Sequence, residues 1–452
     1  MLKWFSSRNT IFIFVTTWFV GVFALLMALV PAGSHFDIDS SLYLKMANDF
    51  SDKGVFGYQG ACCHWMGIGY PVFILFIKNL FGSGILPILL AQLLIMLATV
   101  WLLWRTALRL FSQSVTNLSV VLAALTIGYH LYPQFILTEA LMVFLISLGL
   151  ERFTAFLQSG KMLTLMFSGF AYGVSIWLKS SAWYLALCLI IFPIFFLWDR
   201  KIKKRFLAAL VFGASFFVPV TVLYYRNYLA HGHFKLPRVD QVTLYMRVWP
   251  KLKERVGIGK YQTFGAKLPV TEFLSGKGWE KESLEFRRFI LEYPIDFLIV
   301  VSKEIIKNVL GLYTNHLKVL LYDDITGGDC SFFIFDGSIF NKIHRYLSFG
   351  TKSIMIYSIG VFEILWNLIR IPLILFALIS LLVMCRFSIA ALMALHVVYF
   401  LFIGLLDGCA RYRIPAEGAM IILSALGIMI LWRRFRQKYS WHDAMRMDLN
   451  LT

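Results

Sequence analysis

The chain has 452 residues, of which 59% are hydrophobic and only 15% are charged, and its mean hydropathy is +0.72. Soluble domains carry about a quarter charged residues, so this composition excludes an ordinary soluble enzyme and indicates a protein whose solvent is largely lipid. The net charge of +18 lies in short basic clusters between long apolar runs, as the positive-inside rule describes, which argues against a nucleic-acid partner.

Ten apolar runs approach the roughly 20 residues that a helix needs to cross a bilayer. The first, from Ile11 to Pro31, follows Lys3 and Arg8 and has no convincing small-residue cleavage site after it. We interpret it as a membrane anchor with the N-terminus inside, because a signal peptide is shorter and ends at such a site. The other nine runs cover residues 85–104, 116–132, 136–156, 163–178, 182–198, 206–225, 366–385, 388–406 and 416–432.

Basic residues end these runs in a regular way. Alternation of the runs across the membrane predicts that the N-terminus and the C-terminal tail are both cytoplasmic, because it brings five basic clusters to one side. These clusters are Arg105 with Arg109, Arg152 with Lys161, residues 200–205, Arg386, and Arg433 with Arg434, Arg436 and Lys438. Residues 296–322 and 351–365 are amphipathic or short and are candidates for the membrane interface. We therefore predict an all-α bundle of about 10 to 12 transmembrane helices.

Two long connections fall outside the cytoplasm in this topology, residues 32–69 and about 229–350. The second has mixed charges and an amphipathic run after Pro294, which is typical of a small subdomain resting on the membrane. The predicted organisation is an N-terminal transmembrane module (1–228), an extracytoplasmic region with interfacial helices (229–350), C-terminal transmembrane helices (351–433) and a cytoplasmic tail (434–452).

The first outer connection begins with a candidate interfacial helix, because Leu42, Tyr43, Met46 and Ala47 recur at helical spacing. Asp39 stands at the start of this helix. A carboxylate at that position serves equally well as an N-cap or as a catalytic base, and Asp37 is equally well a solvated loop carboxylate. Both interpretations stay open on these residues alone.

Glu139 stands at the outer end of the run 136–156, with apolar residues around it. A carboxylate near this depth needs a partner or a chemical task, unless it only complements the start of a helix. Lys179, between the runs 163–178 and 182–198, is the nearest opposite charge by topology.

Residues 407–415 form a short outer connection that carries Arg411 and Arg413, where the positive-inside rule predicts few basic residues. A guanidinium group binds phosphate through two parallel hydrogen bonds and keeps its charge, so the pair indicates an anionic headgroup. The alternative is that both side chains extend to the phosphates of ordinary membrane lipids.

The six cysteines lack the paired short spacings of a structural zinc site. Four of them, Cys62, Cys63, Cys330 and Cys409, fall outside the cytoplasm in this topology, where a disulfide can persist, but the sequence does not indicate a pairing. His231 and His233 have a spacing that suits a metal but more often marks a polar loop. The sequence has no phosphate-binding glycine loop of nucleotide enzymes and no convincing serine-histidine pair.

Together and in this order, these segments resemble the GT-C superfamily of membrane glycosyltransferases, in the branch of the protein mannosyltransferases and the aminoarabinose transferase of lipid A. The resemblance is close over the first seven runs and loose over about 235–400. The chain departs from some relatives because Ser40 and Ser41 follow Asp39 where those carry a second acid or a basic residue, which leaves the base assignment open. The matching residues are Asp37, Asp39, Ser40, Tyr43 and Ala47, then Gly69 to Pro71, Leu137 to Glu139, Ser168 to Gly173 before Lys179, Tyr225 to Tyr228 before Gly232, and most specifically Ala410 to Pro415.

The resemblance implies transfer of a single sugar from a polyprenyl-phosphate carrier to a hydroxyl of a lipid, glycan or protein, with inversion and without a nucleotide sugar. It also implies a multi-pass protein of a bacterial inner membrane whose active site faces the periplasm. No cofactor is required, although the acidic residues are a candidate site for a divalent metal. The implied roles are general base for Asp39, with Asp37 as the alternative, an orienting or second acid for Glu139, donor-phosphate binding for Arg411, Arg413, Lys179 and Arg226, and contacts with sugar or isoprenoid for Tyr43 and Tyr412.

Two other functions stay open. A secondary transporter or lipid flippase would use the same intramembrane charges, although such folds tend to have related halves and a site at the bilayer midplane. An O-antigen ligase or polymerase would act on the same face of the membrane but would use a diphosphate-linked glycan.

Overall fold

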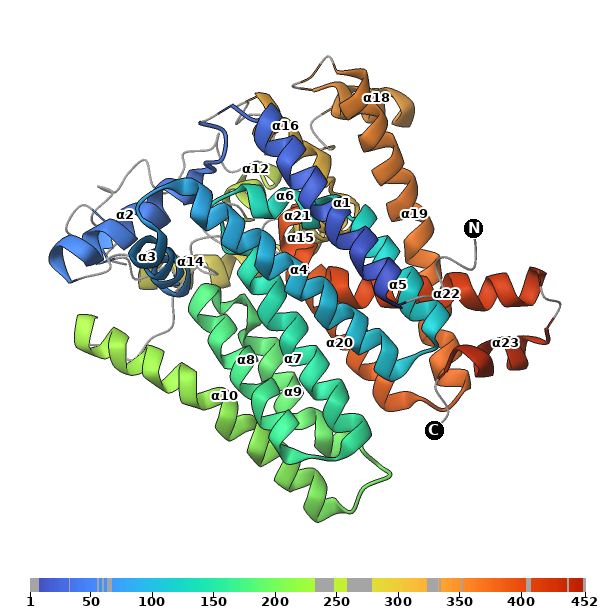
Figure 1. Ribbon diagram of the computed structural model, residues 1–452. Helices are drawn as coiled ribbons and strands as arrows, with labels where there is room; N and C mark the ends of the chain where they lie inside the picture. The colour runs from blue at the N-terminus through green and yellow to red at the C-terminus, as the bar shows by residue number, and fades with distance from the viewer. Residues whose placement is uncertain are drawn as a thin grey trace.

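The computed structural model describes an almost entirely helical protein (Figure 1). The residues that it describes are 8–31, 33–54, 57–58, 61–62, 67–231, 248–257, 279–322, 332, 335–349, 351, 353–403, 408–436 and 439–449.

Within these ranges, six helices are long and apolar enough to cross a membrane. A seventh span results if the pair α5 and α6, which is bent by 58°, counts as one. Where the structure describes them, which excludes residues 404–406, the ten predicted apolar runs fall mostly on helices, so the polytopic all-α architecture is confirmed. The long helices are α1 (Arg8–Leu29), α4 (Ile85–Leu110), α7 (Glu139–Ser159), α10 (Ile202–His231), α19 (Ile354–Val383) and α22 (Glu417–Arg436), and the shorter ones are α3 (Gly69–Phe81), α5 (Gln113–Leu125), α6 (Ile127–Leu131), α8 (Met162–Leu178), α9 (Trp183–Phe196) and α20 (Phe387–Ile403).

In the N-terminal module, helix α8 packs closely against both α7 and α10. Gly169 and Gly173 let α8 approach the backbone of α10, because a Cβ atom at either position would lie 2.4 Å from a carbonyl oxygen of α10. Ser168 donates a hydrogen bond of 2.7 Å to the carbonyl of Gly149, which joins α8 to α7. Small residues favour such approaches in membranes, where packing and hydrogen bonds replace the hydrophobic effect between helices.

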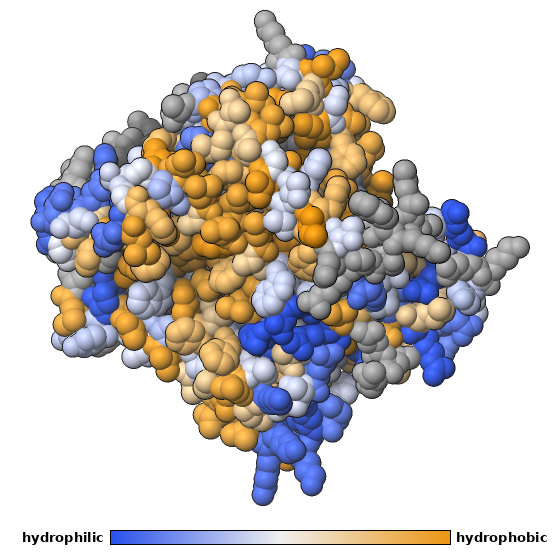
Figure 2. Space-filling model, in the orientation of Figure 1, coloured by the Kyte–Doolittle hydropathy of each residue, from blue (hydrophilic) through white to orange (hydrophobic). Residues whose placement is uncertain are grey.

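The basic ends of several helices lie together. Glu151 is fully buried on α7, and its carboxylate lies 3.0 Å from Arg105 Nε, 3.1 Å from Arg109 Nη2 and 2.5 Å from Arg152 Nε. Figure 2 shows a broad hydrophobic area across the middle of one face, with hydrophilic side chains gathered at its edges. Arg105 with Arg109, and Arg152, belong to two basic clusters that the predicted topology assigns to one side of the membrane, and they are neighbours in the fold.

The C-terminal tail returns to this basic end. Helix α23 (Trp441–Asp448) ends at Asp448, whose carboxylate accepts hydrogen bonds from Arg433 Nε at 3.0 Å and from Ser112 Oγ at 2.8 Å. The tail is thereby fixed against the turn between α4 and α5, next to the cluster around Glu151.

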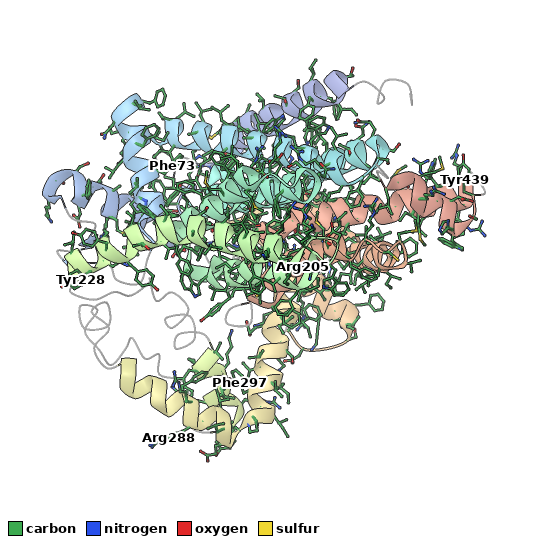
Figure 3. The ribbon with its side chains drawn as sticks, turned by 90° about the horizontal axis from the view of Figure 1, so that it is seen from below. Phe73, Arg205, Tyr228, Arg288, Phe297 and Tyr439 are labelled. Atoms are coloured by element: carbon green, nitrogen blue, oxygen red, sulfur yellow. The ribbon has the colours of Figure 1, made fainter. Side chains whose placement is uncertain are left out.

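The first long connection, predicted for residues 32–69, holds α2 (Ile38–Lys53) and a two-stranded antiparallel hairpin, β1 (Gly57–Tyr58) and β2 (Ala61–Cys62). The second holds α12 (Trp249–Arg255), α14 (Trp279–Glu292), α15 (Pro294–Leu310), α16 (Tyr313–Tyr322) and α18 (Ile339–Ser348). Trp249, Phe286 and Val300 form a small separate core between α12, α14 and α15. Figure 3 shows Arg288 and Phe297 on helices that project from the main body of the bundle.

One element differs from the prediction. Residues 354–383 form the single helix α19, so the separate segment predicted for 351–365 is mostly the beginning of a long span. The polar residues Glu363, Asn367 and Arg370 were no obstacle to the span because all three are buried against other helices.

Candidate active site

The candidate site forms where four segments meet: the start of α2, the start of α7, the link between α8 and α9, and the short helix α21 (Ala410–Arg413). Asp37 precedes α2, and Asp39 lies within its first turn. The hydroxyl of Ser40 accepts a hydrogen bond of 2.8 Å from the backbone N–H of Asp37 and so fixes this turn. Asp39 is therefore not the N-cap of α2, and its side chain projects towards Arg411.

The guanidinium group of Arg411 binds all three predicted acids. Its Nη1 lies 3.3 Å from Asp37 Oδ2, its Nη2 lies 2.9 Å from Asp39 Oδ2, and its Nε lies 2.5 Å from Glu139 Oε1. Lys179 Nζ lies 2.5 Å from the same oxygen of Glu139. The structure thus joins five predicted site residues into one ion-pair cluster of three carboxylates and two cations.

The three acids differ in access to solvent. The side chain of Glu139 is 2% exposed, whereas those of Asp37 and Asp39 are 23% and 34% exposed. Glu139 also gives one oxygen to both Lys179 and Arg411. This arrangement suits Glu139 to orient the cations, and it leaves Asp39 the most accessible to a substrate hydroxyl.

A pocket lies beside the cluster, and both charged and apolar side chains line it. Its polar lining comes chiefly from Glu139, Lys179 and Arg411. Lys179 Nζ also lies 5.5 Å from the centre of the Tyr412 ring, which is a cation–π distance. Such a lining suits an anionic head that is attached to an apolar chain. The remaining lining residues are Met142, Ser181, Phe400, Ile403, Tyr412, Ile414 and Pro415.

Tyr43 lies beneath Asp39 and is only 3% exposed. Its ring contacts Tyr70 edge to face, with 5.0 Å between the ring centres, and the hydroxyl of Tyr70 donates to Gln92 at 2.7 Å. Burial, with the nearby charge of Asp39, raises the pKa of Tyr43 well above its ordinary value, so the hydroxyl stays protonated. This placement supports a structural role, in which Tyr43 packs α2 against Tyr70. The predicted contact of Tyr43 with sugar or isoprenoid is less well supported.

Arg413 has no exposed surface and points away from the cluster. Its Nη1 donates to the carbonyls of Asn308, Val309 and Gly311 at 2.9, 2.7 and 3.0 Å, and its Nε donates to Glu417 at 3.0 Å. The predicted donor-phosphate contact does not fit this position, and Arg413 instead joins α21 to the end of α15.

Arg226 is also not brought to the pocket. It lies near the end of α10, where its Nη1 donates to Asn227 Oδ1 at 2.9 Å, and it is not among the residues that line the pocket. Figure 3 shows Tyr228, two residues further on, at the edge of the molecule.

Sequence reasoning did not find a second buried cluster, which lies behind α21. Glu417 accepts hydrogen bonds from Arg370 Nη1 at 2.8 Å and from the Tyr313 hydroxyl at 2.9 Å. Glu363 accepts from the backbone N–H groups of Tyr313 and Thr314 at 2.7 and 3.0 Å. The available signal was the spacing of seven residues between Glu363 and Arg370, which puts two ionisable residues on one face of an apolar helix.

The predicted metal is a separate question. Among the described residues, no group of three or more His, Cys, Asp and Glu side chains is arranged to hold a metal ion. Asp37, Asp39 and Glu139 are instead each bound by Arg411. Other predicted features lie outside the described residues, namely Asp407, Cys63, Cys330 and His233, and the side chains of Cys62 and His231.

Comparison with known proteins agrees with this architecture. The family model of dolichyl-phosphate-mannose-protein mannosyltransferases matches residues 67–225, which is less than half of the chain. No curated protein sequence matches the chain.

Solved structures extend the comparison to nearly the whole chain. The oligosaccharyltransferase of Archaeoglobus fulgidus in the apo form has a TM-score of 0.53 and 12% identity, with 95% of this chain and 51% of that chain covered. The same enzyme, AglB, in complex with an inhibitory peptide and a dolichol-phosphate has a TM-score of 0.51 and 13% identity, with 94% and 52% covered. ArnT of Cupriavidus metallidurans bound to undecaprenyl phosphate has a TM-score of only 0.38 and 12% identity, with 96% of this chain and 82% of that chain covered.

This chain spans about half the length of the archaeal enzyme. Identity at this level shows the fold alone. The GT-C fold expected from the sequence is therefore confirmed, and the chain is a multi-pass membrane protein with that fold.

Proposed function

We propose that this protein is a membrane glycosyltransferase that moves a sugar from a polyprenyl-phosphate carrier to an acceptor hydroxyl. The observation that carries the proposal is the cluster in which Arg411 links Asp37, Asp39 and Glu139 at the edge of a partly apolar pocket. The match to the dolichyl-phosphate-mannose-protein mannosyltransferase family model supports the same class of donor.

The cations suit the phosphate of the donor. Arg411 and Lys179 lie side by side on Glu139, and Met142, Phe400 and Ile403 give the same pocket an apolar wall. Charge-assisted hydrogen bonds from both cations would stabilise the negative charge that grows on the phosphate as it leaves. The isoprenoid chain would extend along the apolar wall towards the lipid.

The acids suit the acceptor. In the proposed step, the acceptor hydroxyl gives its proton to Asp39 while its oxygen forms a bond to the anomeric carbon of the sugar. The bond from that carbon to the phosphate oxygen breaks, and polyprenyl phosphate leaves with the bonding electrons. One displacement of this kind inverts the anomeric configuration. Asp37 is the alternative base because it is the next most exposed acid of the cluster.

The charge pattern supports a proposal for which side of the membrane the site faces. The basic ends gathered around Glu151 belong to connections that differ from those of the Arg411 cluster, and the positive-inside rule assigns such ends to the cytoplasm. We propose that the site faces the outside, in a bacterium the periplasm, and that the acceptor is a lipid, a glycan or a protein.

The test uses purified protein in nanodiscs with synthetic polyprenyl-monophosphate sugars. Release of polyprenyl phosphate together with a glycosylated acceptor is the expected result, and parallel reactions with EDTA test whether transfer needs a divalent metal. Turnover only with diphosphate-linked glycans would favour a ligase or polymerase. Movement of intact lipid between leaflets without bond cleavage would favour a flippase.

A further inference from the structure

Glu304 of α15 is a buried acid outside the site just described. It is 2% exposed, and its Oε2 accepts a hydrogen bond of 2.9 Å from the backbone N–H of Gly408, three residues before Arg411. Its Oε1 lies 2.7 Å from Lys307 Nζ on the same helix and 3.0 Å from Lys251 Nζ on α12. One side chain thus contacts both the outer helices and the segment that carries Arg411.

The backbones of these two segments also touch. A Cβ atom at Gly408 would lie 2.0 Å from the carbonyl oxygen of Glu304, and one at Gly311 would lie 3.0 Å from the backbone nitrogen of Ala410. Figure 1 shows α21 directly beside α15. Only glycine permits this approach, so the position of α15 determines the position of the backbone that leads to Arg411.

Helix α15 holds the neighbouring elements as well. Asn308 Nδ2 donates to the carbonyls of Phe400 and Leu401, at the end of α20, at 2.9 and 2.8 Å. Arg413, just after Arg411, donates to three carbonyls at the end of α15. Helix α15 therefore fixes the chain on both sides of Arg411, and Glu304 supplies its contact at Gly408.

The charge of Glu304 strengthens that contact. Burial opposes the ionised form, but Lys251 and Lys307 outweigh it, and the pKa of Glu304 is lower than its usual value. A hydrogen bond from a backbone N–H to a carboxylate is stronger than one to a neutral oxygen.

We infer that Glu304 is a positioning residue for Arg411, which sets the place of the guanidinium group by holding the backbone of Gly408. The inference rests on the proposed function, because the phosphate is what Arg411 is positioned to bind. Through Lys251, the same residue links the donor site to the outer unit of α12, α14 and α15.

The test compares three variants in nanodiscs. Glu304→Ala removes the acceptor of the Gly408 N–H, and Glu304→Gln keeps an oxygen acceptor without the charge. Lys251→Ala is the matched control, because it removes the contact with α12 and leaves Glu304 paired with Lys307. We expect Glu304→Ala to lower kcat/KM for the donor about tenfold to a hundredfold, with the KM for the acceptor unchanged. Glu304→Gln should recover part of the loss, and Lys251→Ala should retain most of the activity.

A second measurement does not depend on activity. Amide hydrogen exchange of residues 408–412 should become faster in Glu304→Ala and stay near the parent value in Lys251→Ala. If the parent protein transfers no sugar, the proposed function fails, while the exchange data still report whether Glu304 holds this segment. Unchanged exchange in Glu304→Ala, or equal losses in Glu304→Ala and Lys251→Ala, would overturn the positioning role. If Glu304→Ala does not fold, the comparison of Glu304→Gln with Lys251→Ala decides in the same way.

Discussion

Arg411 gathers acids that are far away in the sequence, since Asp37 is 374 residues and Glu139 is 272 residues distant. The sequence marks Arg411 and Glu139 as unusual for their places in a membrane protein and leaves the role of Asp37 open. Only the resemblance to a family predicted that they share one site. Arg413 was predicted to bind the donor phosphate together with Arg411, but it lies apart from the Arg411 cluster. Two residues along a helix turn a side chain by about 200°, so Arg411 and Arg413 leave the short helix α21 on opposite faces. The sequence alone did not predict that α21 was helical.

The first prediction concerns Asp39. Asp39→Asn keeps the shape of the side chain and removes its ability to take a proton, so we expect turnover to fall about a hundredfold to ten-thousandfold. Asp49→Asn is the matched control, because Asp49 lies on the same helix, where it pairs with exposed Lys53 at 3.6 Å. Release of polyprenyl phosphate is the measurement. Near-normal turnover of Asp39→Asn would move the base to Asp37.

The second prediction concerns Arg411. Arg411→Lys keeps the charge but cannot reach Asp37, Asp39 and Glu139 at once, so donor affinity or rate should fall about tenfold to a hundredfold. Arg413→Lys should instead lower the melting temperature, because it breaks buried bonds to carbonyls of α15, and it should change the donor KM less. Turnover against donor concentration, with thermal unfolding measured in parallel, separates the two effects. Equal donor kinetics of Arg411→Lys and the parent would place the phosphate contact elsewhere, with Lys179 the next candidate.

At the scale of elements, hydropathy predicted which segments become helices and was less informative about their ends and bends. The run 116–132 contains the sharp bend between α5 and α6, which the apolar pattern does not reveal. Helix α19 begins twelve residues before the predicted run at 366. The span can include Glu363 because its carboxylate accepts hydrogen bonds from the backbone N–H groups of Tyr313 and Thr314, which are distant in the sequence. An ionisable residue within a membrane-spanning helix predicts that this side of the helix faces other helices, but it does not predict which residue will pair with the charge.

The third prediction tests the packing of α8 against α10. Gly173→Ala puts a Cβ atom 2.4 Å from the carbonyl oxygen of Phe216, so the helices must separate, and we expect a loss of about 1 to 3 kcal/mol in stability. Gly213→Ala is the matched control, because its Cβ atom would meet Ile190 at an ordinary 3.6 Å and the gain in helix propensity is the same. Thermal unfolding in detergent is the measurement. Equal melting temperatures for both variants would contradict the close approach.

At the scale of the whole molecule, charge distribution gave the most reliable guide to which ends of the helices lie together. Arg105, Arg109 and Arg152 come from two connections that alternation assigns to one side, and all three meet at Glu151. The acids of the candidate site belong to connections assigned to the other side, and they are gathered by Arg411. The sequence could divide the helix ends into two groups because the bilayer separates the two sides of the membrane. The contacts within each group depend on how the helices pack, which the sequence pattern does not predict.

The last prediction tests which set faces the cytoplasm. In a variant without native cysteines, single cysteines at Lys53, Arg288 and Lys203 report on α2, on α14 and on the start of α10, and all three positions are exposed. If the basic ends are cytoplasmic, an impermeant thiol reagent applied to spheroplasts should label Lys53→Cys and Arg288→Cys but not Lys203→Cys. Permeabilised cells provide the control, because all three cysteines should then react. Labelling of Lys203→Cys alone in intact spheroplasts would reverse the orientation and move the Arg411 cluster to the cytoplasmic face. Nucleotide sugars would then be available at the same face, whereas the apolar side chains that line the pocket would still favour a lipid-linked donor.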